Sequence, residues 1–100
     1  MKIKYLLPGL ASLLIANQAI AATQDYKCYA QLYDKSFEIA FVDGANISSA
    51  SQAAQVLLSQ GFYAEDGKTL LKVKKVIECQ KMMSSFINVK ANQADERTPR

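Results

Sequence analysis

Cysteine has the most versatile chemistry of the residues in this chain, and it occurs twice, as Cys28 and Cys79. A pair of thiols can form a disulfide, take part in redox exchange or help to hold a metal ion. The two positions lack C-x-x-C spacing, and the chain contains no His to complete a zinc site. Because the N-terminus described below indicates export, we predict a structural disulfide, with a redox or metal pair as the alternatives. Closing a loop of about 50 residues contributes roughly 4 kcal/mol in the chain-entropy model.

The acidic residues are the other candidates for chemistry. The absence of His removes the commonest general base, and with it the Ser-His-Asp and Cys-His arrangements. Two carboxylates can still exchange protons, as in glycoside hydrolysis, and Glu65 and Asp66 are adjacent. They fall in an expected turn, where solvated acidic residues are ordinary, and the sequence has no EF-hand or glycine-rich phosphate loop around them. We therefore expect no enzymatic activity, no metal and no cofactor.

The N-terminal segment has the three-part pattern of a secretory signal. Lys2 and Lys4 are followed by the apolar run 5–15, and Ala19-Ile20-Ala21 supplies the small residues of a cleavage site. The apolar run is too short to span a bilayer. We predict a signal peptide over 1–21, a mature chain over 22–100 and a periplasmic location with no stable membrane span after cleavage. A retained membrane anchor is the alternative.

Basic residues do not indicate a nucleic-acid partner. With Lys2 and Lys4 assigned to the signal, the mature chain has ten basic and nine acidic residues, so its net charge is close to zero. The only cluster is Lys72, Lys74, Lys75 and Lys81, whereas a polyanion-binding domain normally carries a larger clustered excess. We interpret these lysines as the solvated face of a strand.

Two strands are predicted to position Cys28. The run 26–33 alternates, with Tyr26, Cys28, Ala30 and Leu32 on its more apolar face, and 37–42 alternates again. In the second strand we expect Phe37, Ile39 and Phe41 to point inward and Glu38 outward. The short polar link 34–36 favours an antiparallel hairpin.

A helix should follow the hairpin. Ser49 and Gln52 fit a capping box, in which each side chain satisfies a free backbone N–H. Apolar residues then recur at helical spacing from Ala50 to Leu58, and Gly61 is placed to end the helix. This pattern predicts an amphipathic helix packed on the sheet.

The longest strand is predicted to end at Cys79. Residues 62–64 are a short strand candidate, and 65–68 contain the Asp-Gly hairpin signal. In the strand that follows, alternation places Leu71, Val73, Ile77 and Cys79 on one face. Lys75 falls on the same face, among these apolar residues. Either the strand passes the edge of the helix at this point and the Lys75 side chain extends to solvent, which we favour, or a bulge near Lys74 and Lys75 shifts the register. The disulfide would pin the first strand of the mature protein to its last and join the outermost strands of the sheet.

The C-terminal part is less regular in pattern. We expect 80–85 to be irregular, Ser85 to cap a short helix running toward Ala94, and a mobile charged tail from about Asp95. The fold class is thus α+β: a single domain with a small antiparallel sheet of order ββαββ, one packed helix, one disulfide and a short C-terminal segment.

Surface recognition is the remaining route to function. Tyr29 and Tyr33 lie on the strand face opposite Cys28, and Tyr63 can join them. Exposed tyrosines are common in interfaces, and we add Lys72 and Lys74 to this predicted partner-binding surface. The alternative is that the C-terminal segment covers the tyrosines. An edge strand could also accept a partner strand by β-augmentation.

Short motifs at both ends of the mature chain resemble a known family. They are Asp25-Tyr26-Lys27-Cys28, Asp66-Gly67-Lys68, Val76-Ile77-Glu78-Cys79 and the terminal run 95–100. Together they resemble the TapY-like family of small exported proteins linked to type IVa pilus secretion systems. The resemblance implies a process, support of a pilus or secretion machine, and it carries over no binding residue.

We therefore expect a non-catalytic periplasmic accessory protein that binds a protein partner in the cell envelope, such as a pilus or secretion component. One alternative is an inhibitor of an exported enzyme, for example a cell-wall hydrolase, with the Glu65-Asp66 turn as the plug. Another is an enzyme that uses carboxylates alone, which predicts a concave site with a perturbed carboxylate pair.

Overall fold

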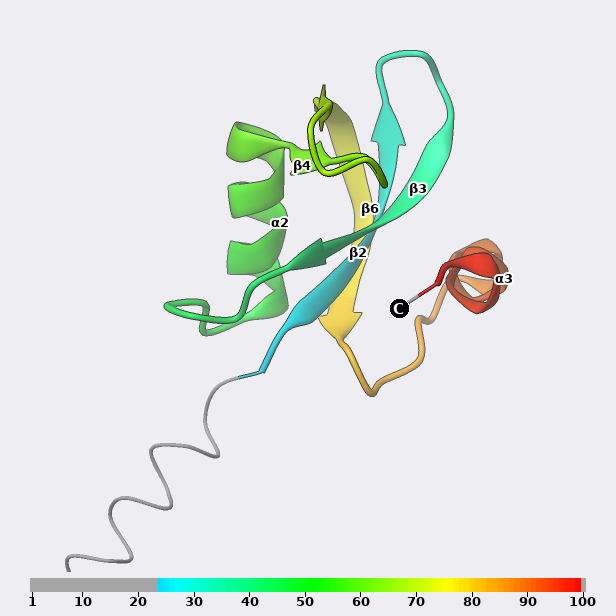
Figure 1. Cartoon of the computed structure of the whole chain (residues 1–100). Helices are drawn as coiled ribbons and strands as arrows, with labels where there is room; N and C mark the ends of the chain where they lie inside the picture. The colour runs from blue at the N-terminus through cyan, green and yellow to red at the C-terminus, as the bar shows by residue number, and fades with distance from the viewer. Residues whose placement is uncertain (1–23, 100) are drawn as a thin grey trace, which may run out of the picture.

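A three-stranded antiparallel sheet forms the centre of the molecule, in the strand order β3-β2-β6. The computed structural model describes residues 24–99, so the predicted signal peptide over 1–21 lies outside the described residues. The elements in chain order are β2 (Tyr26–Leu32), β3 (Phe37–Val42), α2 (Ala50–Gln60), β4 (Phe62–Tyr63), β5 (Leu70–Leu71), β6 (Val73–Lys81) and α3 (Val89–Arg97). Figure 1 shows α2 on one side of the sheet and α3 on the other. The predicted α+β class is confirmed, but two helices cover the sheet instead of one.

The β2–β3 hairpin forms as predicted. Cys28 pairs with Ala40 and Tyr29 with Ile39 in an antiparallel register. Asp34 closes the turn, because its carboxylate accepts hydrogen bonds from the backbone N–H and the hydroxyl of Ser36, at 2.9 and 2.6 Å. This turn fixes which side chains of β2 and β3 share a face.

The disulfide joins Cys28 to Cys79, which are direct partners in the β2–β6 register. The bond is confirmed, but its predicted place at the outermost strands is wrong. β2 is the central strand of the sheet and β6 is its neighbour. The bond therefore reinforces the middle of the sheet and leaves β3 as an edge strand.

Two bulges interrupt β6, which is the longest strand, as predicted. Tyr29 pairs with Glu78 and Ala30 with Val76, which leaves Ile77 as an extra residue. A second shift, between Gln31 and Leu32, leaves Lys74 extra in the same way. The bulge explanation that we did not favour is thus the one observed near Lys74, because each extra residue reverses the alternation. Consequently Val76 packs against the α2-side core and Ile77 is exposed, contrary to the predicted face.

Helix α2 begins and ends where the sequence indicates. The Ser49 hydroxyl accepts a hydrogen bond from the Gln52 N–H, but the Gln52 side chain accepts from Ser48 instead of closing the capping box on Ser49. Gly61 has φ 72° and donates its N–H to the Leu57 carbonyl. A Cβ at Gly61 would lie 2.4 Å from the carbonyl oxygen of Leu71, so the β4–β5 hairpin can pack close to the end of the helix.

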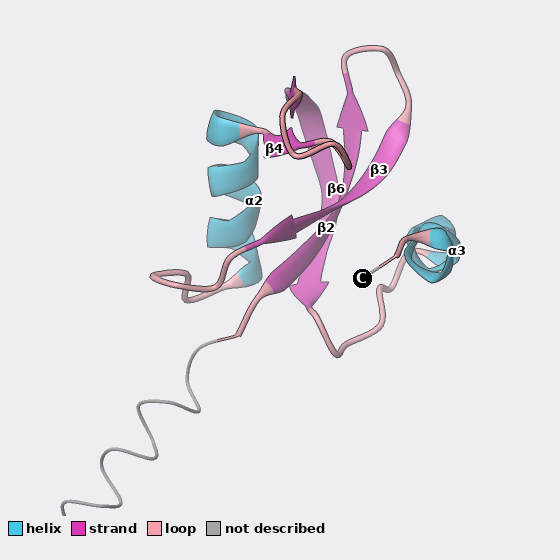
Figure 2. Cartoon of the chain, viewed as in Figure 1, coloured by secondary structure: helices cyan, strands magenta, loops and turns pink. Residues whose placement is uncertain are grey.

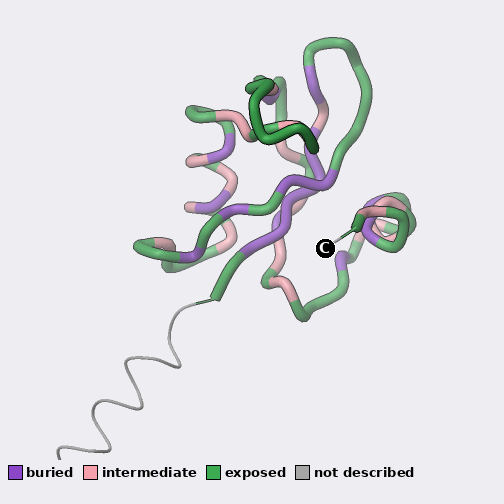
Figure 3. The backbone as a smooth tube through the Cα atoms, viewed as in Figure 1, coloured by how far each residue is buried: buried purple, intermediate pink, exposed green. Residues whose placement is uncertain are grey.

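The sheet is buried on both faces, as the purple segments of Figure 3 show. The α2-side core is apolar and consists of Tyr26, Cys28, Ala30, Leu32, Ala40, Val42, Ala53, Leu57, Val73 and Cys79. The α3-side core is smaller and consists of Tyr29, Ile39, Phe86 and Ala91. The predicted inward face of β3 is therefore only partly right. Ile39 is buried on the α3 side, whereas Phe37 and Phe41 remain 45% and 40% exposed and Ala40 and Val42 face α2.

The C-terminal segment is a folded part of the domain. Helix α3 is capped by Asn88, whose side chain accepts from the Ala91 N–H, so Ser85 does not cap it. Asp95 is only 9% exposed and lies within α3, which continues to Arg97. Figure 2 shows the loop that leads from the end of β6 to α3 beside the sheet.

Candidate functional site

A buried ion pair connects the sheet to α3. The Lys27 ammonium lies 2.6 Å from the Asp95 carboxylate, and the two side chains are only 4% and 12% exposed. The same ammonium lies 4.9 Å from the centre of the Phe86 ring, within range of a cation–π contact. Since Lys27 points to the face opposite Cys28, this pair is the polar centre of the α3-side core. The pair connects the sheet to α3, and both of its side chains are largely buried.

Glu78 holds the loop that leads into α3. Its carboxylate accepts hydrogen bonds from the N–H groups of Ile87 and Asn88 and from the Gln80 side chain, at 2.7 to 2.9 Å. Burial raises the pKa of this carboxyl, but the three hydrogen bonds outweigh burial and lower it overall. Asn92 adds a second tie, because its side chain both accepts from and donates to the Phe86 backbone.

The Glu65-Asp66 turn stabilises its own backbone. Asp66 accepts hydrogen bonds from the N–H groups of Lys68 and Thr69 and from the Thr69 hydroxyl. Bonds from Thr69 and Lys68 lower the pKa of Asp66, so the carboxylate is ionised at neutral pH. A catalytic acid needs the opposite shift. Asp66 is thus a turn residue in this fold, and its pKa is shifted away from that of a catalytic acid.

Among residues 24–99 the structure shows no group of three or more His, Cys, Asp or Glu side chains that could hold a metal ion. Both cysteines are in the disulfide. None of the described helices is long and apolar enough to cross a membrane.

The predicted partner-binding surface is only partly accessible. Tyr29 is 7% exposed and stacks on Phe37, with ring centres 5.3 Å apart, so its predicted exposure is wrong. The alternative prediction, a cover formed by the C-terminal segment, holds for this residue, because Tyr29 packs in the α3-side core. Tyr33 and Tyr63 are 68% and 62% exposed. Lys72 and Lys74 are also exposed, Lys72 at the break between β5 and β6 and Lys74 on a bulge.

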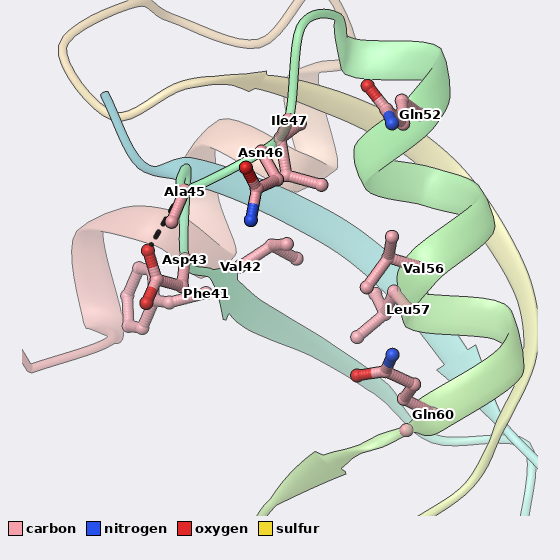
Figure 4. Close-up of a pocket in the computed structure, with 11 residues that line it drawn as sticks. Phe41, Val42, Asp43, Ala45, Asn46, Ile47, Gln52, Val56, Leu57 and Gln60 are labelled. Carbon is pink, nitrogen blue, oxygen red and sulfur yellow. Dashed lines mark hydrogen bonds between the residues drawn. The ribbon is translucent and has the colours of Figure 1, made fainter. Parts of the chain in front are cut away.

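One hollow lies between the end of β3 and α2 and has a volume of about 420 Å³ (Figure 4). Val42, Ile47, Val56 and Leu57 line its apolar part. Four polar side chains also line it, Asp43, Asn46, Gln52 and Gln60, and two of them make hydrogen bonds to nearby residues. Asp43 accepts from the Ala45 N–H, and Gln52 accepts from Ser48. The hollow is thus a gap between a helix and a strand end that has both apolar and polar walls.

A second and larger hollow, of about 1030 Å³, follows the edge of β3. One wall is formed by β3 residues 38–41, and the opposite wall by Phe62, Tyr63, Ala64 and the following turn. Leu71 and the C-terminal residues Thr98 and Pro99 complete the lining. We call this hollow the β3-edge groove. Of the five residues predicted for a partner surface, Tyr63 is the one that lines it.

Sequence reasoning missed both the Lys27–Asp95 pair and the β3-edge groove. The first had a weak signal, since Lys27 is a lone charge between apolar strand residues, and Ala91 and Asp95 are spaced as one helix face. The groove had none, because its two walls are separated in the chain by α2.

A family model described as "Type IVa secretion system protein TapY2-like" matches residues 5–100, nearly the whole chain. No curated protein and no solved structure gives a significant match.

Proposed function

Since the chain belongs to the TapY2-like family of type IVa secretion system proteins, we propose that it is a non-catalytic accessory protein that binds another component of this machinery in the periplasm. The family supplies the link to the secretion system. The mode of action and the compartment are our proposal.

The observation that carries the proposal is that both thiols and the buried or partly buried ionisable groups named above serve the fold. The two thiols form the disulfide, Lys27 and Asp95 join the sheet to α3, and Glu78 holds the loop before it. A protein whose ionisable groups are used in this way is suited to present a stable surface. The outer edge of β3, which is a terminal strand of the sheet, and the groove beside it supply such a surface.

Two features support a periplasmic location. The N-terminal sequence has the pattern of a cleavable secretory signal. In addition, disulfides persist in oxidising compartments such as the bacterial periplasm and are rare in the cytosol.

In vivo crosslinking with a tagged chain expressed from its own locus tests the proposal. We expect the tagged protein in the periplasmic fraction, with its cysteines protected from alkylation until reductant is added, and crosslinked to a type IVa component. A tagged periplasmic protein of similar size and unrelated function is the control for non-specific capture.

Deletion of the gene should reduce type IVa-dependent secretion or piliation, and expression of the exported chain should restore it. Normal secretion and piliation in the deletion strain, together with crosslinks to unrelated proteins only, would contradict the proposal.

A further inference from the structure

The β3-edge groove follows a strand edge and not one face of the sheet. Four consecutive residues of β3, from Glu38 to Phe41, all line it. Successive side chains of a strand point to opposite faces, so a hollow that touches all four must run along the edge itself. The edge belongs to the sheet because β3 is the terminal strand of the order β3-β2-β6.

This edge offers backbone groups for a further strand. Cys28 and Cys79 have Cα atoms 4.1 Å apart, the close spacing of an antiparallel pair that does not exchange backbone hydrogen bonds. Cys28 therefore turns its N–H and C=O toward Ala40, its partner in β3. The pattern alternates, so the next residue, Ile39, turns its N–H and C=O away from β2 and into the groove.

The size and walls of the groove fit an extended peptide. About 1030 Å³ is at the upper limit of ordinary small-molecule pockets. The wall opposite β3 is formed by Phe62, Tyr63 and Ala64, and Leu71 contributes apolar surface beside them. A strand laid along β3 would place alternate side chains against this wall.

The charge of the groove selects the side chains of that peptide. Glu38, Glu65 and Asp66 line it, and its lining within residues 24–99 includes no Lys or Arg. Glu38 and Glu65 are exposed. The ion pair found among the described residues joins Lys27 to Asp95 and involves neither of them. Asp66 retains its charge while it holds its own turn.

We propose that the β3-edge groove binds an extended segment of the partner that carries Lys or Arg, adds as a strand to β3 and places its basic side chains near Glu38 and Glu65. This inference rests on the proposed function, because it names the surface and the chemistry by which the accessory protein holds its partner.

A synthetic peptide of alternating Lys and Val is the probe, and the same peptide with Glu in place of Lys is its control. Titrated into the mature domain at low salt, the Lys peptide should bind and shift the amide resonances of 37–42 and 62–66, and the Glu peptide should not. Equal binding of the two peptides, or shifts confined to other residues, would overturn the inference.

Strand addition is separated from simple charge attraction by N-methylation. One version of the Lys peptide is methylated on the Val amides and another on the Lys amides. Every second N–H of an added strand points to β3, so one version should lose binding and the other should keep it. Equal affinity of both versions would exclude strand addition.

The variant Glu38→Lys with Glu65→Lys tests the charge. Both positions are exposed, so the fold should be retained, and affinity for the Lys peptide should fall by about tenfold or more. Glu96→Lys, an exposed carboxylate outside the groove, is the matched control and should bind normally. If light scattering shows a dimer of the unaltered domain that the double variant no longer forms, a second copy occupies the edge, which contradicts the inference.

The same double variant in cells separates this inference from the proposed function. Loss of the crosslinked type IVa component with the double variant, but not with Glu96→Lys, supports both. If the double variant still captures the component, the inference fails and the proposed function stands. If the unaltered protein captures none, the proposed function fails.

Discussion

The two faces of the sheet are closed by different physical means. On the α2 side, ten buried residues form an apolar core that includes the disulfide. On the α3 side, four buried residues surround an ion pair, and Glu78 and Asn92 secure the loop to the helix by hydrogen bonds. Apolar burial is insensitive to pH, whereas ionic and charge-assisted contacts require one protonation state. The comparison indicates that α2 and the sheet form the stable body of the domain and that α3 is a docked element.

The largest expected effect is removal of the disulfide. In the variant Cys28→Ser with Cys79→Ser, the free energy of unfolding should fall by about 4 kcal/mol, because the bond closes a loop with a sequence separation of 51 residues. Urea denaturation of the mature domain measures the change. The unaltered protein under reducing conditions is the control and should match the variant. A loss below about 1 kcal/mol would show that the body of the domain does not depend on this bond.

Leu57→Ala tests the apolar core directly. Leu57 is 2% exposed, so its truncation should destabilise the domain by about 3 kcal/mol at both neutral and acid pH. Leu58→Ala is the matched control, because Leu58 is the next residue of α2 and is 47% exposed. Similar losses for the two variants would show that α2 is not packed through this face.

Asp95→Asn tests the ionic face. Removing one partner of a buried ion pair costs about 3–5 kcal/mol, but α3 can detach before the sheet unfolds. We therefore expect a smaller loss of global stability than for Leu57→Ala, with hydrogen exchange accelerated over 86–97 and unchanged in β2 and β6. Glu96→Gln is the control. It alters the carboxylate of the next residue, which is exposed, and should leave the rate of hydrogen exchange unchanged. Equal acceleration throughout the sheet would contradict the division into a body and a docked helix.

Glu78→Gln should have the smallest effect. We expect the free energy of unfolding to fall by about 1 kcal/mol at neutral pH, because the Glu78 side chain is partly exposed. The pKa of Glu78 is lowered in the folded protein from its ordinary value of 4.5. Its contribution is therefore present above about pH 4.5 and is lost as the pH falls through the folded pKa. Urea denaturation at neutral pH and near pH 3 should show that the difference between Glu78→Gln and the unaltered protein shrinks in acid. A difference that grows in acid would contradict the stated direction of the pKa shift.

The parts of the fold that the sequence predicted well are specified locally. Ser49 and Gly61 mark the ends of α2 by their own backbone and side-chain geometry, and Asp66 with Gly67 marks the β4–β5 turn. The disulfide followed from the number of cysteines and the export signal. In each case the deciding residues are neighbours in the chain or have few possible partners.

The parts that were not predicted depend on distant partners. Asn88 and Asn92 are poor helix residues by propensity, yet α3 forms because Asn88 caps it and Asn92 binds the Phe86 backbone. Lys27 and Asp95 are separated by 68 residues, so no local pattern pairs them. The bulges at Lys74 and Ile77 each add a residue to β6 and so change which side chains of this strand face α2. The simple alternation assumed from the sequence does not hold across them. The β3-edge groove was missed for the same reason, since it exists only where two separate hairpins meet.

The position of the disulfide has a mechanical consequence. Tyr26 pairs with Lys81 and Lys27 with Gln80, so the chain enters and leaves the sheet on adjacent strands, two residue pairs from the Cys28–Cys79 bond. Tension applied between the segment before β2 and helix α3 would pass through that covalent bond after those pairs separate. The chain between the two cysteines, including β3, α2 and the β4–β5 hairpin, lies outside the line of force. A pull on the two ends would strip α3 from the domain and leave the edge of β3 in its folded shape.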